Sequence, residues 1–356
     1  MKRLEPVSER KEETVRYLAK GGVAALCGAA VIALTMSSGL AAVTLRMSSQ
    51  WPETTVGSQI DKWWASEIEK RTGGEVKIKI FWAGVLGKAK ENLGLLRNGA
   101  IDLAAMSPGY FPAELPFHAA PNSIPMAMSS VSQAYALMHR VMKEVPEFDA
   151  EAARNGVKTL FFHHLNPYLL VCKKAVAGLA DMRGKKVRTW GKDMPRMVEA
   201  AGAVPVTLGL AELYEGLSRG TVDCIPFSVD LMVNYKIYEV AKNVHDITLW
   251  EGPTNATWIS LKAWNALTPA QRQVIQAVSG EAATRDRDAV IAAGEKAIAT
   301  LKAKGVHFRK FPAADKKKWK AANPDFFAEF IAAQEKLGRG DAARKFIAIW
   351  REVTAK

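Results

Sequence analysis

The sequence of 356 residues lacks the short motifs that usually mark an enzyme. It contains no GxSxG elbow, no HExxH pair, no Walker-type phosphate loop and no GxGxxG after a predicted strand. It also has no low-complexity segment and no detectable internal repeat. Nothing in the sequence indicates an activated nucleophile, a general base or a bound cofactor. We therefore expect a protein that is not an enzyme and needs no cofactor.

Cysteine is scarce as well, with three in the whole chain. Cys27 falls in the N-terminal leader, whereas Cys172 and Cys224 lie in predicted buried strands, where we expect them to act as small apolar core residues. An exported protein could oxidise them to a disulfide if the two strands were neighbours, which the sequence alone does not establish. No CxxC motif and no Cys/His spacing predicts a metal site.

The pair His163-His164 is the other candidate for metal or catalytic chemistry. Successive residues of a strand point to opposite faces of the sheet. We therefore expect that the two imidazoles do not converge on one ion and that the pair has no chemical role.

The chain is basic, with a formal net charge of +13. Its positive residues are spread among acidic ones, and the main cluster is Lys316-Lys317-Lys318. A nucleic-acid-binding protein usually concentrates its positive charge on one face, so we expect no nucleic-acid partner. The surplus instead indicates a solvated basic surface that would attract anionic solutes.

The N-terminal segment differs from the rest of the chain. Positive residues within the first 20 positions precede a charge-free run from Gly21 to Leu45, and Gly39-Leu40-Ala41 offers the small residues that a signal peptidase reads. We interpret residues 1–41 as an export signal, with cleavage after Ala41 or Ala42. The alternative is a retained membrane anchor, since a run of this length could span a bilayer.

Strand and helix signals alternate along the rest of the chain, which predicts an α/β fold. With 49% hydrophobic residues the chain can bury a large core, and its length favours two lobes. The pattern around residue 188 predicts a strand near Val187, a helix from Met194 to Ala201, a strand from Val204 to Thr207 and a helix from Ala211 to Arg219. Arg188 therefore lies at a strand end beside a turn.

The motifs of this region have a known counterpart. Gly184, Lys186 and Arg188 fit the pattern GxKxR, and residues 202–208 and 212–223 fit GAxPVxL and ELYxxLxxGxVD. In this order they resemble the solute-binding proteins of TRAP transporters, the tripartite ATP-independent periplasmic systems of the C4-dicarboxylate-binding-protein-like family. Matching signals at residues 81–106 and 243–267 extend the resemblance from about Ala42 to the end of the chain.

The resemblance implies an α/β two-lobe periplasmic binding protein, or Venus flytrap, with a long helix that spans both lobes. We expect lobe I to comprise residues 42–164 plus about 253–290, and lobe II residues 165–252 plus about 291–356. The helical pattern from Pro269 to about Lys304 corresponds to the spanning helix. The aromatic residues that follow it, among them Trp319, Phe326 and Trp350, are expected on helices that pack on lobe II.

The resemblance also implies a ligand site. Arg188 would hold a ligand carboxylate through two parallel hydrogen bonds, a geometry that suits guanidinium and not lysine. Tyr168 lies where some relatives carry a second arginine, and Phe227 lies where many carry a ligand-binding asparagine. The other expected contacts come from turns near strand ends, at Gln50, Trp51, Ser107, Tyr110 and Trp190.

The aromatic residues of this set favour an acid with an apolar or aromatic body, because buried hydroxyl groups without partners would weaken binding by about 1 to 3 kcal/mol each. The expected function is capture in the periplasm of a monocarboxylate such as a 2-oxo or aromatic acid. The protein, expected as a monomer without a metal, would deliver it to small and large permease subunits driven by an ion gradient. The alternatives are a ligand-sensing subunit for a signalling receptor and an exported enzyme on the same scaffold.

Overall fold

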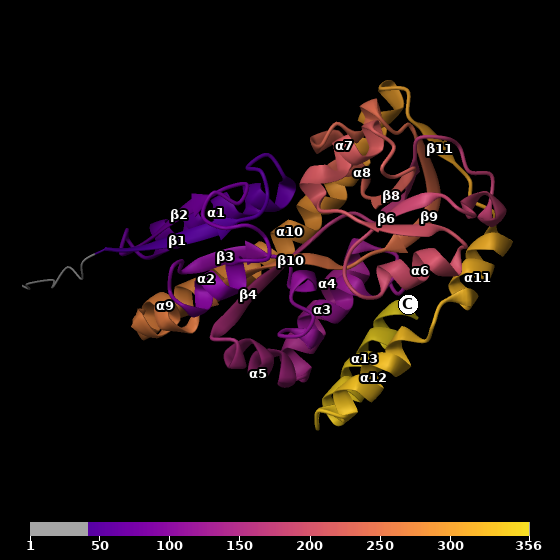
Figure 1. The fold of residues 1–356 in the computed structure, drawn as a ribbon. Coiled ribbons are helices and arrows are strands. Elements are labelled where there is room, and N and C mark those ends of the chain that lie inside the picture. The colour runs from indigo at the N-terminus through magenta and orange to yellow at the C-terminus, as the bar shows by residue number, and fades with distance from the viewer. Residues whose placement is uncertain (1–41, 356) are drawn as a thin grey trace, which may run out of the picture. The chain divides into compact units, whose positions relative to one another are not determined.

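A computed structural model describes residues 42–355 as two α/β lobes, each built around its own sheet (Figure 1). The α/β class and the two-lobe arrangement expected from the sequence are thus confirmed. The predicted export signal lies outside the described residues. Within those residues, no helix combines the length and the apolar character needed to cross a membrane.

The first lobe contains a five-stranded sheet with the order β2-β1-β3-β10-β4. Strands β1 to β3 are parallel, and β10 runs antiparallel to both β3 and β4. The strands are β1 (Val43–Ser49), β2 (Val76–Phe81), β3 (Leu103–Met106), β4 (Val157–His164) and β10 (Pro253–Ser260). The associated helices are α1 (Val56–Arg71), α2 (Asn92–Arg97), the 3-10 turn η1 (Pro108–Tyr110), α3 (Pro116–Ser123), α4 (Val131–Glu144), α5 (Glu147–Arg154) and α9 (Leu261–Ala266).

The second lobe contains a six-stranded sheet with the order β11-β9-β5-β8-β6-β7. Its strands are β5 (Tyr168–Cys172), β6 (Lys186–Thr189), β7 (Val204–Thr207), β8 (Cys224–Phe227), β9 (Asn243–Trp250) and β11 (His307–Arg309). The helices are η2 (Leu179–Met182), α6 (Met194–Ala200), η3 (Leu210–Glu212), α7 (Leu213–Ser218), α8 (Val229–Asn234), η4 (Ile237–Glu239) and α11 (Ala313–Ala322). The four elements predicted around Arg188 are all present, to within a few residues at their ends.

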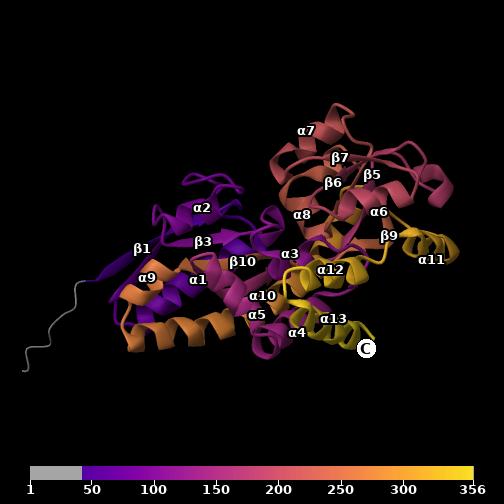
Figure 2. The ribbon, with the colours of Figure 1, turned by 60° about the horizontal axis from the view of Figure 1, so that its bottom comes forward.

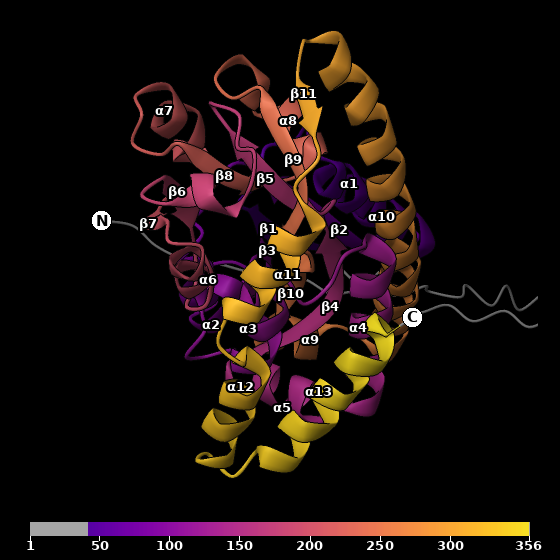
Figure 3. The ribbon, with the colours of Figure 1, turned by 90° about the vertical axis from the view of Figure 1, so that its right-hand side faces the viewer.

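The long helix α10 (Pro269–Ala303) contacts both lobes, as expected (Figure 3). Thr268 caps its N-terminus in a capping box with Gln271, which explains why a 35-residue helix begins there. Its N-terminal half packs into the core of the first lobe through residues such as Ile275, and its C-terminal turns enter the core of the second through Leu301. At 1.5 Å per residue such a helix extends about 50 Å.

The last two helices, α12 (Phe326–Glu335) and α13 (Gly340–Thr354), bury their apolar faces in the core of the first lobe (Figure 2). Helix α12 also contacts the second lobe, through the ion pair of Glu329 with Arg196 of α6. Phe330 and Phe346 contact Phe117 of α3, with ring centroids 5.4 and 6.1 Å apart. Of the aromatic residues named for this region, Trp319 in α11 belongs to the second-lobe core as expected, and Phe311 lies there as well. The expectation that the whole C-terminal region packs on lobe II was wrong, because an apolar helix face indicates burial without indicating which lobe buries it.

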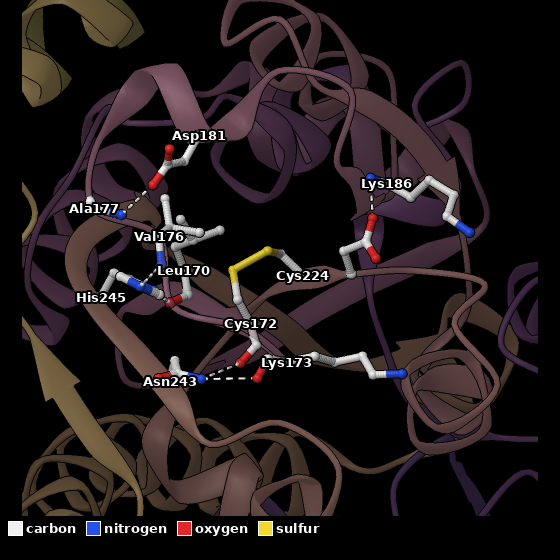
Figure 4. Close-up of a disulfide and its surroundings, with 11 residues drawn as sticks. Leu170, Cys172, Lys173, Val176, Ala177, Asp181, Lys186, Cys224, Asn243 and His245 are labelled. Atoms are coloured by element: carbon white, nitrogen blue, oxygen red, sulfur yellow. Dashed lines mark hydrogen bonds between the residues drawn. A yellow bond between two sulfur atoms is a disulfide. The ribbon is translucent and has the colours of Figure 1, made fainter.

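Cys172 and Cys224 form a disulfide between β5 and β8 (Figure 4). The two strands are antiparallel neighbours, and their register sets the cysteines directly opposite each other, with Cα atoms 4.1 Å apart. Both residues belong to the buried core, as expected, and of the two states that the sequence left open the disulfide is the one that forms. Strand register decided the outcome, and register depends on pairing partners far away in the sequence.

Candidate functional site

Six of the eight predicted site residues line one cavity between the lobes. Most of its lining comes from residues at or just after the carboxyl ends of strands, where open α/β sheets usually bind ligands. The lining consists of Gln50, Ser107, Tyr110 and Asn122 from the first lobe, and Tyr168, Arg188, Trp190, Leu210 and Trp250 from the second.

Arg188 is the buried cation of this cavity, with 3% of its surface exposed. Its Nε donates to the carbonyl of Leu208 at 3.2 Å, whereas its Nη1 is buried without a hydrogen-bond partner. The guanidinium lies over the Trp190 ring, 4.2 Å from the centroid. Burial lowers the pKa of Arg188, although an arginine stays charged at neutral pH. No carboxylate among residues 42–355 forms an ion pair with this group.

A buried charge without a counterion is unfavourable, so Arg188 is well placed to receive an anion. Paired guanidinium donors fit a carboxylate, which can accept two parallel hydrogen bonds. The geometry of the cavity therefore suits capture of an acid.

Aromatic rings form the second-lobe side of the cavity. Tyr168 packs against Trp190 and Trp250, with ring centroids 5.5 and 5.0 Å apart. Burial raises the pKa of the Tyr168 phenol, so the hydroxyl keeps its proton. Phe227 is fully buried and contacts Tyr168 and Tyr235 but does not line the cavity. The apolar wall expected from Phe227 is made instead by the two tryptophans.

The first-lobe side is polar and internally bonded. The backbone N–H of Ser107 donates to the side-chain Oε1 of Gln50 at 3.3 Å, and its hydroxyl donates to Asn122 Oδ1, also at 3.3 Å. A Cβ at Gly109 would lie 1.8 Å from Asn122 Oδ1, so only glycine fits there. Trp51 lies outside the cavity, buried against His163 with ring centroids 5.6 Å apart.

Three lining residues were missed by the sequence analysis, namely Asn122, Leu210 and Trp250. Trp250 is the last residue of β9, so its place at a strand end is the signal that could have found it. Leu210 opens the 3-10 turn after β7. Asn122 lies inside α3, where no local signal distinguishes a ligand-facing amide from a buried polar residue.

The free volume at the centre of these side chains is about 20 Å³. That space accommodates about one water molecule and is too small for an organic acid. Ligand entry therefore requires the lobes to move apart or the cavity side chains to rearrange.

His163 and His164 lie away from this cavity, in a buried network on the first lobe. Contrary to expectation, both imidazoles reach one group: His163 Nδ1 lies 2.9 Å from Asp286 Oδ1, and His164 Nδ1 lies 3.1 Å from Asp286 Oδ2. The pairing of β4 with β10 shifts register opposite these residues, so strict alternation does not hold there. In residues 42–355 no group of three or more His, Cys, Asp or Glu is arranged to hold a metal ion.

Burial disfavours a charge on His163, but Asp61 and Asp286 outweigh that effect and raise its pKa to about 10. Although burial opposes ionisation of Asp286 too, its histidine neighbours lower the pKa of that carboxyl. The network is thus a buried ion pair that ties α10 to β4 and α1. Two of its buried atoms, Asp61 Oδ2 and His164 Nε2, have no hydrogen-bond partner among the described residues.

Several curated proteins are similar to this chain. It is 28% identical over 279 residues to an uncharacterized protein of Haemophilus influenzae. The match covers 77% of this chain and 83% of that protein. It is 25% identical to the 2,3-diketo-L-gulonate-binding periplasmic protein of Escherichia coli, over 77% of this chain and 83% of that protein. A match to an uncharacterized Salmonella typhimurium protein, 24% identical, spans 59% of this chain and 64% of that protein.

Solved structures share the fold at low sequence identity. A marine metagenome TRAP solute-binding protein in complex with pyroglutamate superposes with a TM-score of 0.78 at 18% identity, covering 88% of this chain and 99% of that one. A TRAP periplasmic solute-binding protein from Sulfitobacter with bound β-D-galacturonate gives a TM-score of 0.75 at 22% identity, covering 87% and 100%. The family model for bacterial extracellular solute-binding protein, family 7, matches residues 47–334. The chain therefore belongs to this family, the non-enzymatic periplasmic solute-binding proteins of TRAP transporters.

Proposed function

We propose that this protein captures an organic monocarboxylate in the periplasm by an ion pair with Arg188. The observation that carries the proposal is a fully buried guanidinium, in a cavity lined by both lobes, that has no anionic partner among the described residues. An acid would supply the missing charge, and closure of the lobes would exclude water and strengthen the pair.

The proposed ligand has an apolar or aromatic body. Trp190, Trp250 and Tyr168 provide flat apolar surfaces around Arg188, whereas the polar groups of Ser107, Gln50 and Asn122 are largely bonded to each other. A polyhydroxylated acid would bury hydroxyl groups without partners. A branched 2-oxo acid or an aromatic acid fits better. A Nostoc relative, 24% identical, is a monocarboxylate 2-oxoacid-binding periplasmic protein, and this supports the choice.

Six predicted residues would touch the ligand: Gln50, Ser107, Tyr110, Tyr168, Arg188 and Trp190. Trp250, Asn122 and Leu210 join them because they line the same cavity. Phe227 would support Tyr168 from outside the cavity, and Trp51, which packs against His163, would not touch the ligand.

Residues 1–41 would direct export and be removed on the way. The Cys172–Cys224 disulfide supports this route, because structural disulfides persist in oxidising compartments such as the periplasm. The mature monomer would deliver its acid to a membrane permease of one small and one large subunit, and the permease would use the ion gradient.

A thermal-shift screen tests the proposal directly. The chain from Ala42 onward is unfolded and refolded to remove any acid carried from the host, then heated with 2-oxo, aromatic, hydroxy, dicarboxylic and sugar acids. A ligand of the folded state raises the melting temperature by mass action. We expect strong shifts with apolar or aromatic monocarboxylates. Shifts confined to sugar acids or dicarboxylates would contradict the proposed ligand class, and no shift with any acid would contradict acid capture itself.

A further inference from the structure

Two tryptophans of the second lobe donate hydrogen bonds to main-chain carbonyls of the first lobe. Trp190 Nε1 donates to the carbonyl of Asn122 at 3.2 Å, and Trp250 Nε1 donates to that of Pro121 at 3.1 Å. Both carbonyls belong to the last turn of α3, and both indole rings line the ligand cavity. Two of the contacts between the lobes are therefore made by side chains that also line the ligand cavity. Others, such as those of Ser123 with Asp193 and of Arg196 with Glu329, are made outside the lining.

The accepting carbonyls are available because α3 ends there. The last four carbonyls of a helix have no partner within it. The N–H of Ile124 takes the carbonyl of Ala120, which leaves those of Pro121 and Asn122 for donors from elsewhere. The indole N–H groups fill this role, and each would otherwise be a buried donor without a partner.

The end of α3 is also held at a fixed position. Asn122 Nδ2 donates to the carbonyl of Pro253 at 3.2 Å, at the start of β10. A Cβ at Gly252 would lie 2.6 Å from the carbonyl oxygen of Pro121, so the β9–β10 connection approaches α3 closely. The acceptors thus sit on a rigid part of the first lobe, beside a chain segment that crosses between the lobes.

The donors, in turn, touch the charged centre of the cavity. The Trp190 ring lies beneath the Arg188 guanidinium, and the Trp250 ring packs against Trp190 with centroids 5.9 Å apart. A carboxylate held by Arg188 would therefore be linked to the α3 carbonyls through a single side chain, that of Trp190. Fixing the guanidinium would fix the Trp190 ring and aim its N–H at α3.

We propose that Trp190 and Trp250 form a latch that joins ligand capture by Arg188 to closure of the lobes. The proposal rests on the proposed function, since it assigns a role in acid retention to residues of the same cavity. The latch forms only when α3 and the second lobe meet, so it slows release of the acid more than it affects capture. A hydrogen bond of ordinary strength corresponds to a two- to tenfold change in affinity for each indole, at about 0.5 to 1.5 kcal/mol.

The test compares Trp190→Phe, Trp250→Phe and the double variant with Trp319→Phe. Phenylalanine keeps an apolar ring but removes the N–H. Trp319 is the matched control, because its Nε1 donates to the carbonyl of Met197 at 2.7 Å, within the second lobe. The measurements are acid release by stopped flow, the radius of gyration by small-angle X-ray scattering with and without acid, and hydrogen exchange of the indole N–H groups by NMR.

In the wild type, added acid should slow exchange of the Trp190 and Trp250 indole protons, leave that of Trp319 unchanged and reduce the radius of gyration. Each Phe variant should release acid two to ten times faster, and the double variant should compact less. Trp319→Phe should match the wild type in release. Equal compaction of wild type and double variant, or unchanged indole exchange, would overturn the latch.

Failure of the proposed function would show itself in a separate measurement, the binding of acids by the wild-type protein. If the wild type binds no acid of the panel, acid capture is wrong, and the latch is judged on the ligand-free proteins. The latch then requires a larger radius of gyration for the double variant than for the wild type. Equal radii would overturn it.

Discussion

At the scale of single residues, Tyr168 brings a hydroxyl into the cavity that contains the Arg188 guanidinium. The raised pKa of this phenol keeps it protonated, so it can donate a hydrogen bond to a bound acid. We expect Tyr168→Phe to weaken acid binding by about tenfold, the effect of losing one hydrogen bond to a charged group. Isothermal titration calorimetry measures the change. Tyr214→Phe, which removes a phenol bonded to Glu239 outside the cavity, should leave affinity unchanged. Full affinity of Tyr168→Phe would exclude the hydroxyl from binding.

The expected site residues came from the resemblance to the TRAP family, and six of them line the cavity because many follow directly after strand ends. Gln50, Ser107 and Trp190 each follow directly after a strand, and the turn geometry brings them to the same edge. Trp51 departs from the prediction because it turns toward His163, where a close approach to Gly57 accommodates its ring. That contact depends on tertiary packing, for which the neighbouring sequence holds no signal.

At the scale of secondary-structure elements, α10 contains two glycines with opposite surroundings. A Cβ at Gly280 would meet nothing within 4 Å, whereas a Cβ at Gly294 would lie 2.4 Å from Asn166 Oδ1. Asn166 cannot easily move, because its amide donates to the carbonyl of Val290 and to Asp230 Oδ1. Gly280 therefore only lowers the helix propensity of α10, whereas Gly294 allows the Asn166 side chain to pack close to the helix backbone.

These surroundings predict opposite effects of the same substitution. Gly280→Ala should raise the free energy of unfolding by about 1 kcal/mol, the difference in helix propensity. Gly294→Ala should lower it, because the methyl group displaces Asn166 from two buried hydrogen bonds. Urea unfolding of both variants measures the effects. A stabilised Gly294→Ala variant would show that Asn166 does not constrain α10.

The ion-pair network of His163 joins α10 to α1 and β4 and predicts a pH dependence. Because its folded pKa is raised from 6.5 to about 10, the network contributes fully below about pH 6.5 and is lost as the pH rises through 10. The free energy of unfolding should therefore fall between about pH 6.5 and 9.5 in urea titrations. His163→Gln should remove much of this slope, and His139→Gln, at an exposed histidine, should retain it. Equal slopes for wild type and His163→Gln would rule out a charged His163.

The helices and strands were easier to predict from the sequence than the segments with which they pack. The helical pattern from Pro269 to about Lys304 predicted α10 nearly to its ends, because the signal at Thr268-Pro269 that opens the helix is local. The positions of α12 and α13, the disulfide and the convergence of two histidines on Asp286 all depend on contacts between distant segments. The local sequence of an apolar helix face, a cysteine or a strand does not predict which distant segment it will contact.

At the scale of the whole molecule, the proposed mechanism combines the two lobes, the spanning helix and the buried cation. Arg188 provides the charge in the second lobe, the polar groups around Ser107 face it from the first, and α10 contacts both cores. Closure would trap an acid between the lobes, with Trp190 and Trp250 holding α3 against them. The proposed function therefore depends most on whether the Arg188 guanidinium anchors the ligand.

Calorimetric titration of Arg188→Ala and Arg188→Lys, with the acid that gives the largest thermal shift, tests this most directly. The matched control is Arg183→Ala, which removes an equal charge from an exposed position five residues earlier in the sequence. We predict that Arg188→Ala lowers affinity by at least about a hundredfold while remaining folded. Arg188→Lys should recover little, because a point charge cannot make the two parallel hydrogen bonds. Arg183→Ala should bind like the wild type. Full affinity in either Arg188 variant would contradict the account.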